Sequence, residues 1–240
     1  MVVKEAFPDF EKPSIAVDAV VLRTVQNDRY CEDKRIAPKR LQILLIRKAG
    51  DELWHLPGTI LRLGEVPKTA LNRVFNTDNM YMEQLYTMAD NPMRDERGHI
   101  VSIVYIGITT TDVEAVGVES KWFDIVKPAG IMVRRFVNFD EDSVMSIQEL
   151  MYDHKDIVED ALTRIKNKLM YTDIGFNFVD KEFTITELEN TFTAINERNI
   201  PGFRRIIANK VTGTGKTITG KSFRPAELYI KAVKGECKDE

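Results

Sequence analysis

The segment from Asp153 to Leu169 constrains the fold most strongly, because apolar residues recur in it at helical spacing without any glycine or proline. This spacing predicts one continuous helix. Strand-like runs dominate the sequence before it and helical patterns the sequence after it, and 240 residues suffice for two separate cores. We therefore predict a first domain at residues 1–150, a connecting helix at 151–170 and a second domain at 171–240.

The composition is typical of a folded soluble protein, with 43% hydrophobic and 30% charged residues. No apolar run approaches the roughly 20 residues that a membrane-spanning helix needs, and five of the first 13 residues are charged. We therefore expect a cytoplasmic protein with no membrane partner. Cys31 and Cys237 stand far apart and form no metal-binding cluster, so we expect neither a metal nor a cofactor.

The first part of the chain has the pattern of a mixed α/β domain. Apolar runs rich in β-branched residues predict strands at 15–22, 41–46 and 99–109. Between them, a helix is expected from about Val66 to Asn76, with Pro67 in its first turn.

The second part has the element order of a winged helix. Thr184 and Glu187 form a capping-box pattern ahead of an apolar helix, and a break at 199–202 precedes a helix predicted for Phe203–Lys210. A flexible glycine-rich stretch at 212–221 and a strand at 227–230 follow. Together with the helix of 153–169, the order is helix, helix, short turn, helix and β-ribbon, which is that of a winged helix and predicts DNA binding through the last helix and the ribbon.

Residues 54–80 resemble the Nudix box, the signature of hydrolases that bind magnesium through glutamates on one helix face. Gly58 helps to fix the register of the box, and Glu65 and Arg73 match the signature. Val74, Thr77 and Asp78 stand where the signature has its metal-binding glutamates, and Thr59 and Met80 replace its first and last glycines. One carboxylate on that face cannot replace a cluster, because magnesium binds protein sites weakly. The resemblance thus implies a catalytically inactive Nudix domain with no catalytic residues. Two alternatives are a chance match and a hydrolase that recruits carboxylates from elsewhere.

Further motifs resemble those of the Nudix-related transcriptional regulators. They are the Arg-Asp-x-Arg-Gly stretch within 91–102, Lys121-Trp122-Phe123, residues 171–176, Phe203-Arg204-Arg205 and residues 224–229. The resemblance spans roughly residues 14–233. It implies an α/β chain with a Nudix-type α/β/α sandwich and a C-terminal winged helix-turn-helix domain. It also implies a homodimer that binds palindromic operator DNA and responds to ADP-ribose or a related sugar metabolite.

The same resemblance suggests ligand-binding residues, namely Arg94, Asp95, Arg97 and Trp122. Two guanidinium groups suit a diphosphate, since each offers two parallel charge-assisted hydrogen bonds. The tryptophan could stack on a base or ribose. The alternatives are a solvated charged turn for the arginines and a core position for Trp122.

Positive charge is concentrated near the C-terminus. Residues 198–234 contain nine lysines and arginines and one glutamate, which gives +8 in a chain of net charge −3. Such a segment attracts phosphates. The expected DNA-binding residues are Arg204, Arg205, Lys210, Lys216, Lys221 and Arg224. Neighbouring residues on a helix point about 100° apart, so we expect one of the two arginines to contact a base and the other a phosphate.

The sequence therefore predicts a ligand-responsive transcriptional regulator, most simply a repressor, with a catalytically inactive Nudix domain. One competing interpretation is an ADP-ribose-class Nudix hydrolase with an appended domain. Another is an interaction module whose winged helix binds protein.

Overall fold

The computed structural model describes residues 11–27, 38–127, 133–218 and 225–233. The chain divides into two compact units. The first comprises residues 1–23 and 41–164, and the second comprises residues 24–40 and 165–240. Within the described ranges, no helix is long and apolar enough to cross a membrane.

The first unit is built on a mixed sheet with the strand order β4-β5-β1-β2-β6-β7-β8, and β3 pairs with β1 beside this path. The strands are β1 (Ser14–Gln26), β2 (Lys39–Arg47), β3 (Gly58–Ile60), β4 (Tyr81–Met88), β5 (Ile100–Ile108), β6 (Glu119–Val126), β7 (Arg135–Asn138) and β8 (Ser143–Ser146). β1 and β5 run parallel, whereas β4 runs antiparallel to β5 and β6 to β2.

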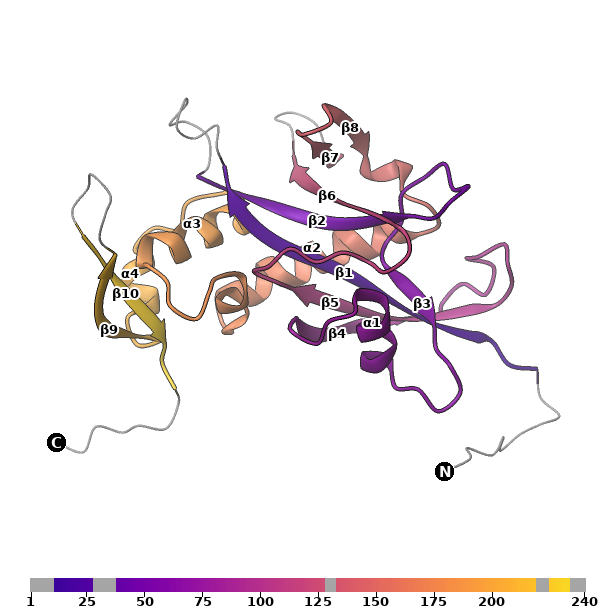
Figure 1. Cartoon of the computed structure of the whole chain (residues 1–240), viewed down its shortest axis with the longest axis horizontal. Helices are drawn as coiled ribbons and strands as arrows, with labels where there is room; N and C mark the ends of the chain where they lie inside the picture. The colour runs from indigo at the N-terminus through magenta and orange to yellow at the C-terminus, as the bar shows by residue number, and fades with distance from the viewer. Residues whose placement is uncertain (1–10, 28–37, 128–132, 219–224, 234–240) are drawn as a thin grey trace. The chain divides into compact units, whose positions relative to one another are not determined.

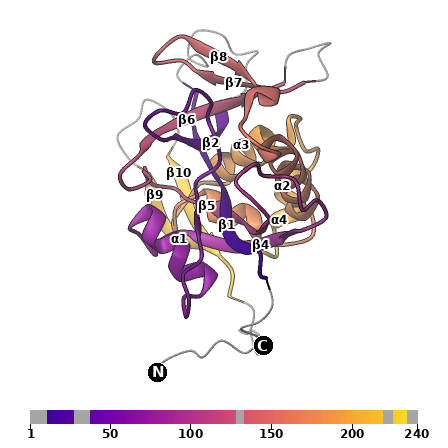
Figure 2. The same cartoon turned by 90° about the vertical axis from the view of Figure 1, so that its right-hand side faces the viewer.

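Two helices cover the two faces of this sheet. Figures 1 and 2 show α1 (Pro67–Phe75) and α2 (His154–Leu169) on opposite sides of β1 and β5. α1 contributes Ala70, Leu71 and Phe75 to a buried cluster that also contains alternate residues of β1, namely Val17, Ala19 and Val21. This alternation is what a strand with both faces covered requires. The α/β/α sandwich predicted from the sequence is thereby confirmed.

The sequence predicted the buried elements better than the peripheral ones. The three expected strands are present as β1, β2 and β5, and Pro67 occupies the first turn of α1 as expected. The strands β4, β6, β7 and β8 were not predicted, because most of their residues are only partly buried and their apolar alternation is weak. The helix predicted for 153–169 is α2, whose six apolar positions are all buried.

The second unit combines short helices with a β-hairpin. Its elements are η3 (Ile174–Phe178), α3 (Ile185–Asn196), α4 (Phe203–Ile207), β9 (Val211–Ile218) and β10 (Ala226–Lys231). The rings of Phe192 in α3 and Phe203 in α4 pack edge to face, with centroids 5.0 Å apart. Phe183 and Tyr229 exchange two backbone hydrogen bonds, which fasten the hairpin to the segment before α3. Figure 1 shows β9 and β10 beside α4.

Three details of this unit differ from the expectations. α4 ends at Ile207 instead of Lys210, and the stretch from Val211, expected to be flexible, forms β9. Thr184 caps α3 by accepting a hydrogen bond from the Glu187 amide. The Glu187 carboxylate, however, pairs with the buried Lys39 ammonium, because an opposite charge competes successfully with a backbone amide.

The division into units also differs from the predicted boundaries. It falls between Arg164 and Ile165, inside α2, and it assigns residues 24–40 to the second unit. Two side chains show why: the Thr24 hydroxyl donates to the Phe178 carbonyl, and Lys39 pairs with Glu187. The end of β1 and the start of β2 thus belong with the C-terminal elements.

Leu71→Ala should lower the free energy of unfolding by about 2–5 kcal/mol, because Leu71 is fully buried in the cluster beneath α1. Leu63→Ala removes the same atoms from a side chain that is 80% exposed and should change stability by less than about 0.5 kcal/mol. Urea unfolding of both variants measures the difference. Equal losses would contradict the packing described for α1.

Candidate functional site

Three of the four predicted ligand residues lie together on the connection between β4 and β5. The Arg94 side chain is only 6% exposed and pairs with Asp153 through both carboxylate oxygens, Nε to Oδ2 at 2.7 Å and Nη2 to Oδ1 at 2.5 Å. Arg97 forms the same kind of bidentate pair with Asp95, Nε to Oδ1 at 2.8 Å and Nη2 to Oδ2 at 2.5 Å. The Arg97 guanidinium also lies 4.9 Å from the centre of the Tyr152 ring. Both arginines are therefore oriented, and both are neutralised.

These residues line a small polar cavity of about 80 Å³. Its other walls come from β1, the Nudix-box loop and the turn that precedes α2, and they include Asp18, His55, Gly58, Tyr152 and His154. Sequence reasoning missed Asp18, Tyr152 and His154. No local spacing connects them with Arg94, because the sheet and α2 bring them together from distant parts of the chain.

Asp18 and Gly58 form the tightest part of this cavity. A Cβ atom on Gly58 would lie 2.0 Å from the Asp18 Oδ1 atom, so only glycine fits there. The Asp18 carboxylate accepts a hydrogen bond from the Ser102 hydroxyl. Burial nevertheless raises the pKa of Asp18 above its usual value. Gly58 thus permits the close approach of β3 to β1, where it pairs with Asp18.

His154 opens α2 and is held by the Nudix-box loop. Its Nδ1 atom accepts a 3.0 Å hydrogen bond from the Leu56 amide, so its proton lies on Nε2. Burial lowers the pKa of His154 to about 3, and the imidazole is therefore neutral at physiological pH. His55 next to it also has a lowered pKa because of burial.

Trp122 lies apart from these residues and is not among the described residues that line the cavity. It stands on β6 opposite Leu44 and packs against the cluster beneath α1. The Arg23 guanidinium stacks on its ring at 4.0 Å from the centroid. The structure therefore brings together the two arginines and Asp95, but not the tryptophan.

The Nudix box keeps its structural ion pair. Arg73 binds Glu65 through two hydrogen bonds of 3.1 Å and donates a third to the Thr59 hydroxyl. The hydrogen bonds from Arg73 lower the pKa of Glu65. These three residues hold the loop between β3 and α1 in place.

The metal-binding part of the box is altered in backbone as well as in sequence. α1 ends at Phe75, and Asn76 adopts a left-handed conformation with φ of 48°. Thr77 and Asp78 therefore lie beyond the helix, which corrects the expectation that Asp78 shares a helix face with position 74. Val74 packs against the core cluster. Among the described residues no group of three or more histidine, cysteine or carboxylate side chains could hold a metal ion, so the residues present do not fit the magnesium site of Nudix hydrolases.

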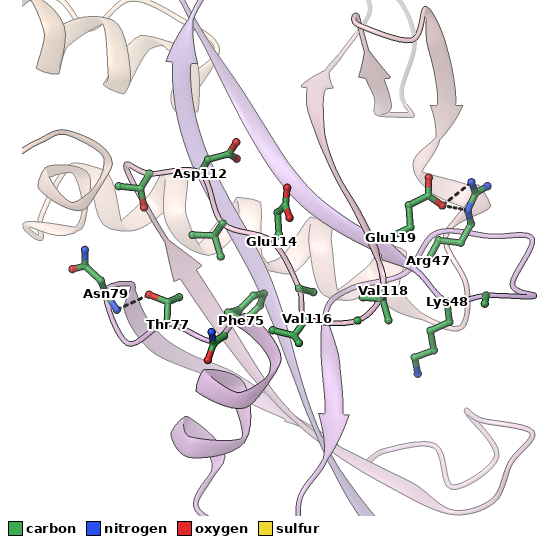
Figure 3. Close-up of a pocket in the computed structure, with 16 residues that line it drawn as sticks. Arg47, Lys48, Phe75, Thr77, Asn79, Asp112, Glu114, Val116, Val118 and Glu119 are labelled. Carbon is green, nitrogen blue, oxygen red and sulfur yellow. Dashed lines mark hydrogen bonds and ion pairs between the residues drawn. The ribbon is translucent and has the colours of Figure 1, made fainter.

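A larger, open cavity of about 930 Å³ lies next to the end of α1 (Figure 3). It is bordered by residues 75–79, by the connection 111–118 and by the ends of β2 and β6. Its charges are mixed: Arg47 pairs with Glu119 at 2.8 Å, and Figure 3 shows the carboxylates of Asp112 and Glu114 on its other side. None of the predicted ligand residues lines it.

The predicted DNA-binding residues fall into three groups. Arg204 and Arg205 are exposed on α4. Two lysines are paired within the unit: Lys210 with Asp173 at 3.5 Å, and Lys216, 64% exposed on β9, with Glu182 at 2.6 Å. The remaining two, Lys221 and Arg224, lie outside the described residues.

Comparison with known families assigns the C-terminal elements. Residues 175–230 match the family model of the NrtR DNA-binding winged helix domain. The C-terminal unit therefore contains a winged helix that is similar to the DNA-binding domain of NrtR. In this winged helix α3 and α4 are the two helices, and the β9–β10 hairpin is the wing.

Similar proteins extend this likeness over most of the chain. The chain is 26% identical over 239 residues to the "ADPR responsive transcriptional repressor NtrR" of Acinetobacter baylyi, covering 92% of this chain and 83% of that protein. Two solved structures share its fold. A MutT/nudix family protein from Enterococcus faecalis has a TM-score of 0.69 at 21% identity, covering 95% of this chain and 90% of that one. Shewanella oneidensis NrtR complexed with a 27mer DNA has a TM-score of 0.62 at 23% identity, covering 91% of this chain and 93% of that one. The resemblance to the Nudix-related transcriptional regulators is confirmed.

His154→Asn should reduce the pH dependence of stability. The pKa of His154 is lower in the folded protein, about 3, than its ordinary 6.5, so the stability it contributes is present above pH 6.5 and lost as the pH falls toward 3. Asparagine cannot titrate but retains an acceptor for the Leu56 amide. The difference in unfolding free energy between wild type and variant should therefore fall by up to about 1.4 kcal/mol per pH unit between pH 6 and 4. A difference that stays constant with pH would show that His154 is not buried as described.

Proposed function

We propose that the protein is a ligand-responsive transcriptional repressor that binds operator DNA through its winged helix and senses ADP-ribose, or a related sugar metabolite, through its Nudix domain. The observation that carries the proposal is the NrtR-type winged helix at 175–230 with two exposed arginines on α4. The description of the Acinetobacter relative as an ADP-ribose-responsive repressor supports the choice of ligand. DNA binding also implies that the protein works in the compartment that holds the chromosome.

For the DNA side, the geometry of α4 supports distinct roles for the two arginines. Arg204 and Arg205 are consecutive on the helix, so their side chains diverge by about 100° and cannot both enter the same base edge. Lys216 on the wing is exposed enough to exchange its Glu182 partner for a phosphate. The proposed contacts also include Lys210, Lys221 and Arg224. A winged helix reads one half-site, so we propose a homodimer that spans two half-sites about one DNA turn or a multiple apart.

For the ligand side, Arg94 and Arg97 supply two planar cations in one cavity, which is the arrangement that suits a diphosphate. We propose that these two residues and Asp95 bind the ligand, with Trp122 as a further contact if the ligand reaches β6. The functional division that follows is a sensor at residues 1–150, the connecting helix at 151–170 and the DNA-binding domain at 171–240.

We further propose that the Nudix domain does not catalyse hydrolysis. Val74 and Thr77 have no metal-binding group of the required kind, and the early end of α1 moves Asp78 off the helix face. Without clustered carboxylates, magnesium would not be held at a diphosphate. The competing function, an ADP-ribose-class hydrolase, is disfavoured by the same observation.

Incubation of the protein with ADP-ribose and magnesium or manganese should therefore release no AMP at the rates of ordinary enzymes, about 1 to 10³ per second. Val74→Glu with Thr77→Glu should not restore turnover either, because Thr77 lies beyond the helix. Wild-type turnover in the ordinary range would establish the hydrolase instead.

Operator binding tests the proposed function directly. DNA duplexes selected from a random pool by the wild-type protein serve as operator, and fluorescence anisotropy at fixed salt gives the affinity. ADP-ribose should shift that affinity by about 5- to 150-fold, and release of the DNA is the expected direction.

Of Arg204→Ala and Arg205→Ala, one should relax base preference at a cost of about 1–3 kcal/mol, and the other should weaken binding to all DNA sequences similarly.

Arg164→Ala provides the control, because it removes one exposed arginine from α2, outside the winged helix. It should leave the operator affinity close to that of the wild type. If the two α4 variants bound the selected duplexes as tightly as Arg164→Ala does, α4 would not be the recognition helix. Calorimetric binding of ADP-ribose without any change in operator affinity would refute the sensor function.

A further inference from the structure

The turn that leads into α2 is fastened to the candidate ligand site at three of its four residues, 151–154. The Met151 amide donates to the Trp54 carbonyl at 3.0 Å, Asp153 holds Arg94 through two hydrogen bonds, and His154 accepts from the Leu56 amide. Tyr152, between these residues, has a φ of 60°, a left-handed conformation that is unfavourable for a bulky aromatic residue. The surrounding contacts therefore hold this turn in a strained form.

Arg94 and Tyr152 also stand between two cavities. The polar cavity of about 80 Å³ holds about two or three waters at liquid density, which is far too little for a diphosphate with its sugars. A second cavity, of about 690 Å³, is lined by the same loop and shares Arg94, Asp95 and Tyr152 with the first. Movement of these shared side chains would join the two spaces.

The charges determine what kind of ligand can cause this movement. Arg94 already forms two short hydrogen bonds to a carboxylate in a nearly buried setting, where such pairs are strong and costly to break. A neutral sugar hydroxyl cannot replace a carboxylate there, because it would leave the guanidinium without a counter-charge. A phosphate or diphosphate can, since two of its oxygens can accept both guanidinium hydrogen bonds and it carries at least as much negative charge.

We propose that Asp153 is an internal competitor for the ligand: an anionic ligand reaches Arg94 only by displacing the Asp153 carboxylate, and this displacement alters the first turn of α2. The proposal rests on the proposed function and makes Asp153 a positioning residue. The Asp153 carbonyl accepts the first hydrogen bonds of α2, from the amides of Asp156 and Ile157. Once Asp153 is released, Tyr152 is free to leave its strained conformation and the helix start changes with it. α2 continues to Leu169, beyond the division at Arg164.

Asp153→Asn tests the proposal, because it keeps the size of the side chain and removes the charge that competes with the ligand. ADP-ribose should bind the variant at least about fivefold more tightly than the wild type, and operator affinity without ligand should fall. The effect of ADP-ribose on operator affinity should shrink toward none, since the displaced state is already populated. Asp156→Asn is the matched control: it removes an exposed carboxylate from the same helical turn and should behave as wild type.

The outcomes separate this proposal from the proposed function. If wild-type operator affinity ignores ADP-ribose, the proposed function fails. If the wild type responds and Asp153→Asn responds equally, with unchanged ADP-ribose affinity, Asp153 is no competitor. If Asp153→Asn does not fold, a competition experiment on the wild-type protein tests the proposal instead. Inorganic pyrophosphate should displace ADP-ribose from the wild type, and arabinose should not. Displacement by arabinose alone would overturn the proposal.

Discussion

The ion pair between Arg94 and Asp153 is the interaction on which the account of this protein depends. It joins the loop between β4 and β5 to the start of α2, and its Arg94 side chain is only 6% exposed. Breaking such a pair without replacing either charge is strongly unfavourable, whereas exchanging one carboxylate for another anion is not. Under the proposed function, such a site is stable when empty and selects anions. The proposed ligand then competes with Asp153, from which α2 begins.

The changes in the Nudix box fit this use of the domain. Its structural parts remain, because Gly58 still permits the close approach of β3 to β1 and Arg73 still anchors Glu65. The residues that would handle a metal have become a core side chain at Val74 and a turn beyond α1. Binding of a diphosphate requires cationic side chains, whereas its cleavage requires the carboxylates that hold a metal ion. The loss of the carboxylates need not disturb the cationic side chains, so a ligand-binding domain can retain the fold of an enzyme.

The sequence predicted those features that depend on local patterns. Helical spacing located α2, β-branched runs located β1, β2 and β5, and the order of elements indicated a winged helix. Arg94 and Arg97 were found because they belong to one short motif. Asp18, Tyr152 and His154 were not, since only the packing of the sheet against α2 brings them to the same cavity. The end of α1 agrees with the prediction to within one residue, but Asp78 was wrongly placed on the helix face, because nothing in the spacing of the box shows that Asn76 turns left-handed.

Amide hydrogen exchange at residues 151–160, with and without ADP-ribose, tests the central claim most directly, because these amides report the state of the first turns of α2. If an anionic ligand displaces Asp153, the amides of Asp156 and Ile157, which donate to the Asp153 carbonyl, should lose protection when ADP-ribose binds. The loop that carries Arg94 should gain protection in the same experiment. ADP-ribose that protects the loop while leaving residues 151–160 unchanged, or that protects both, would contradict the account.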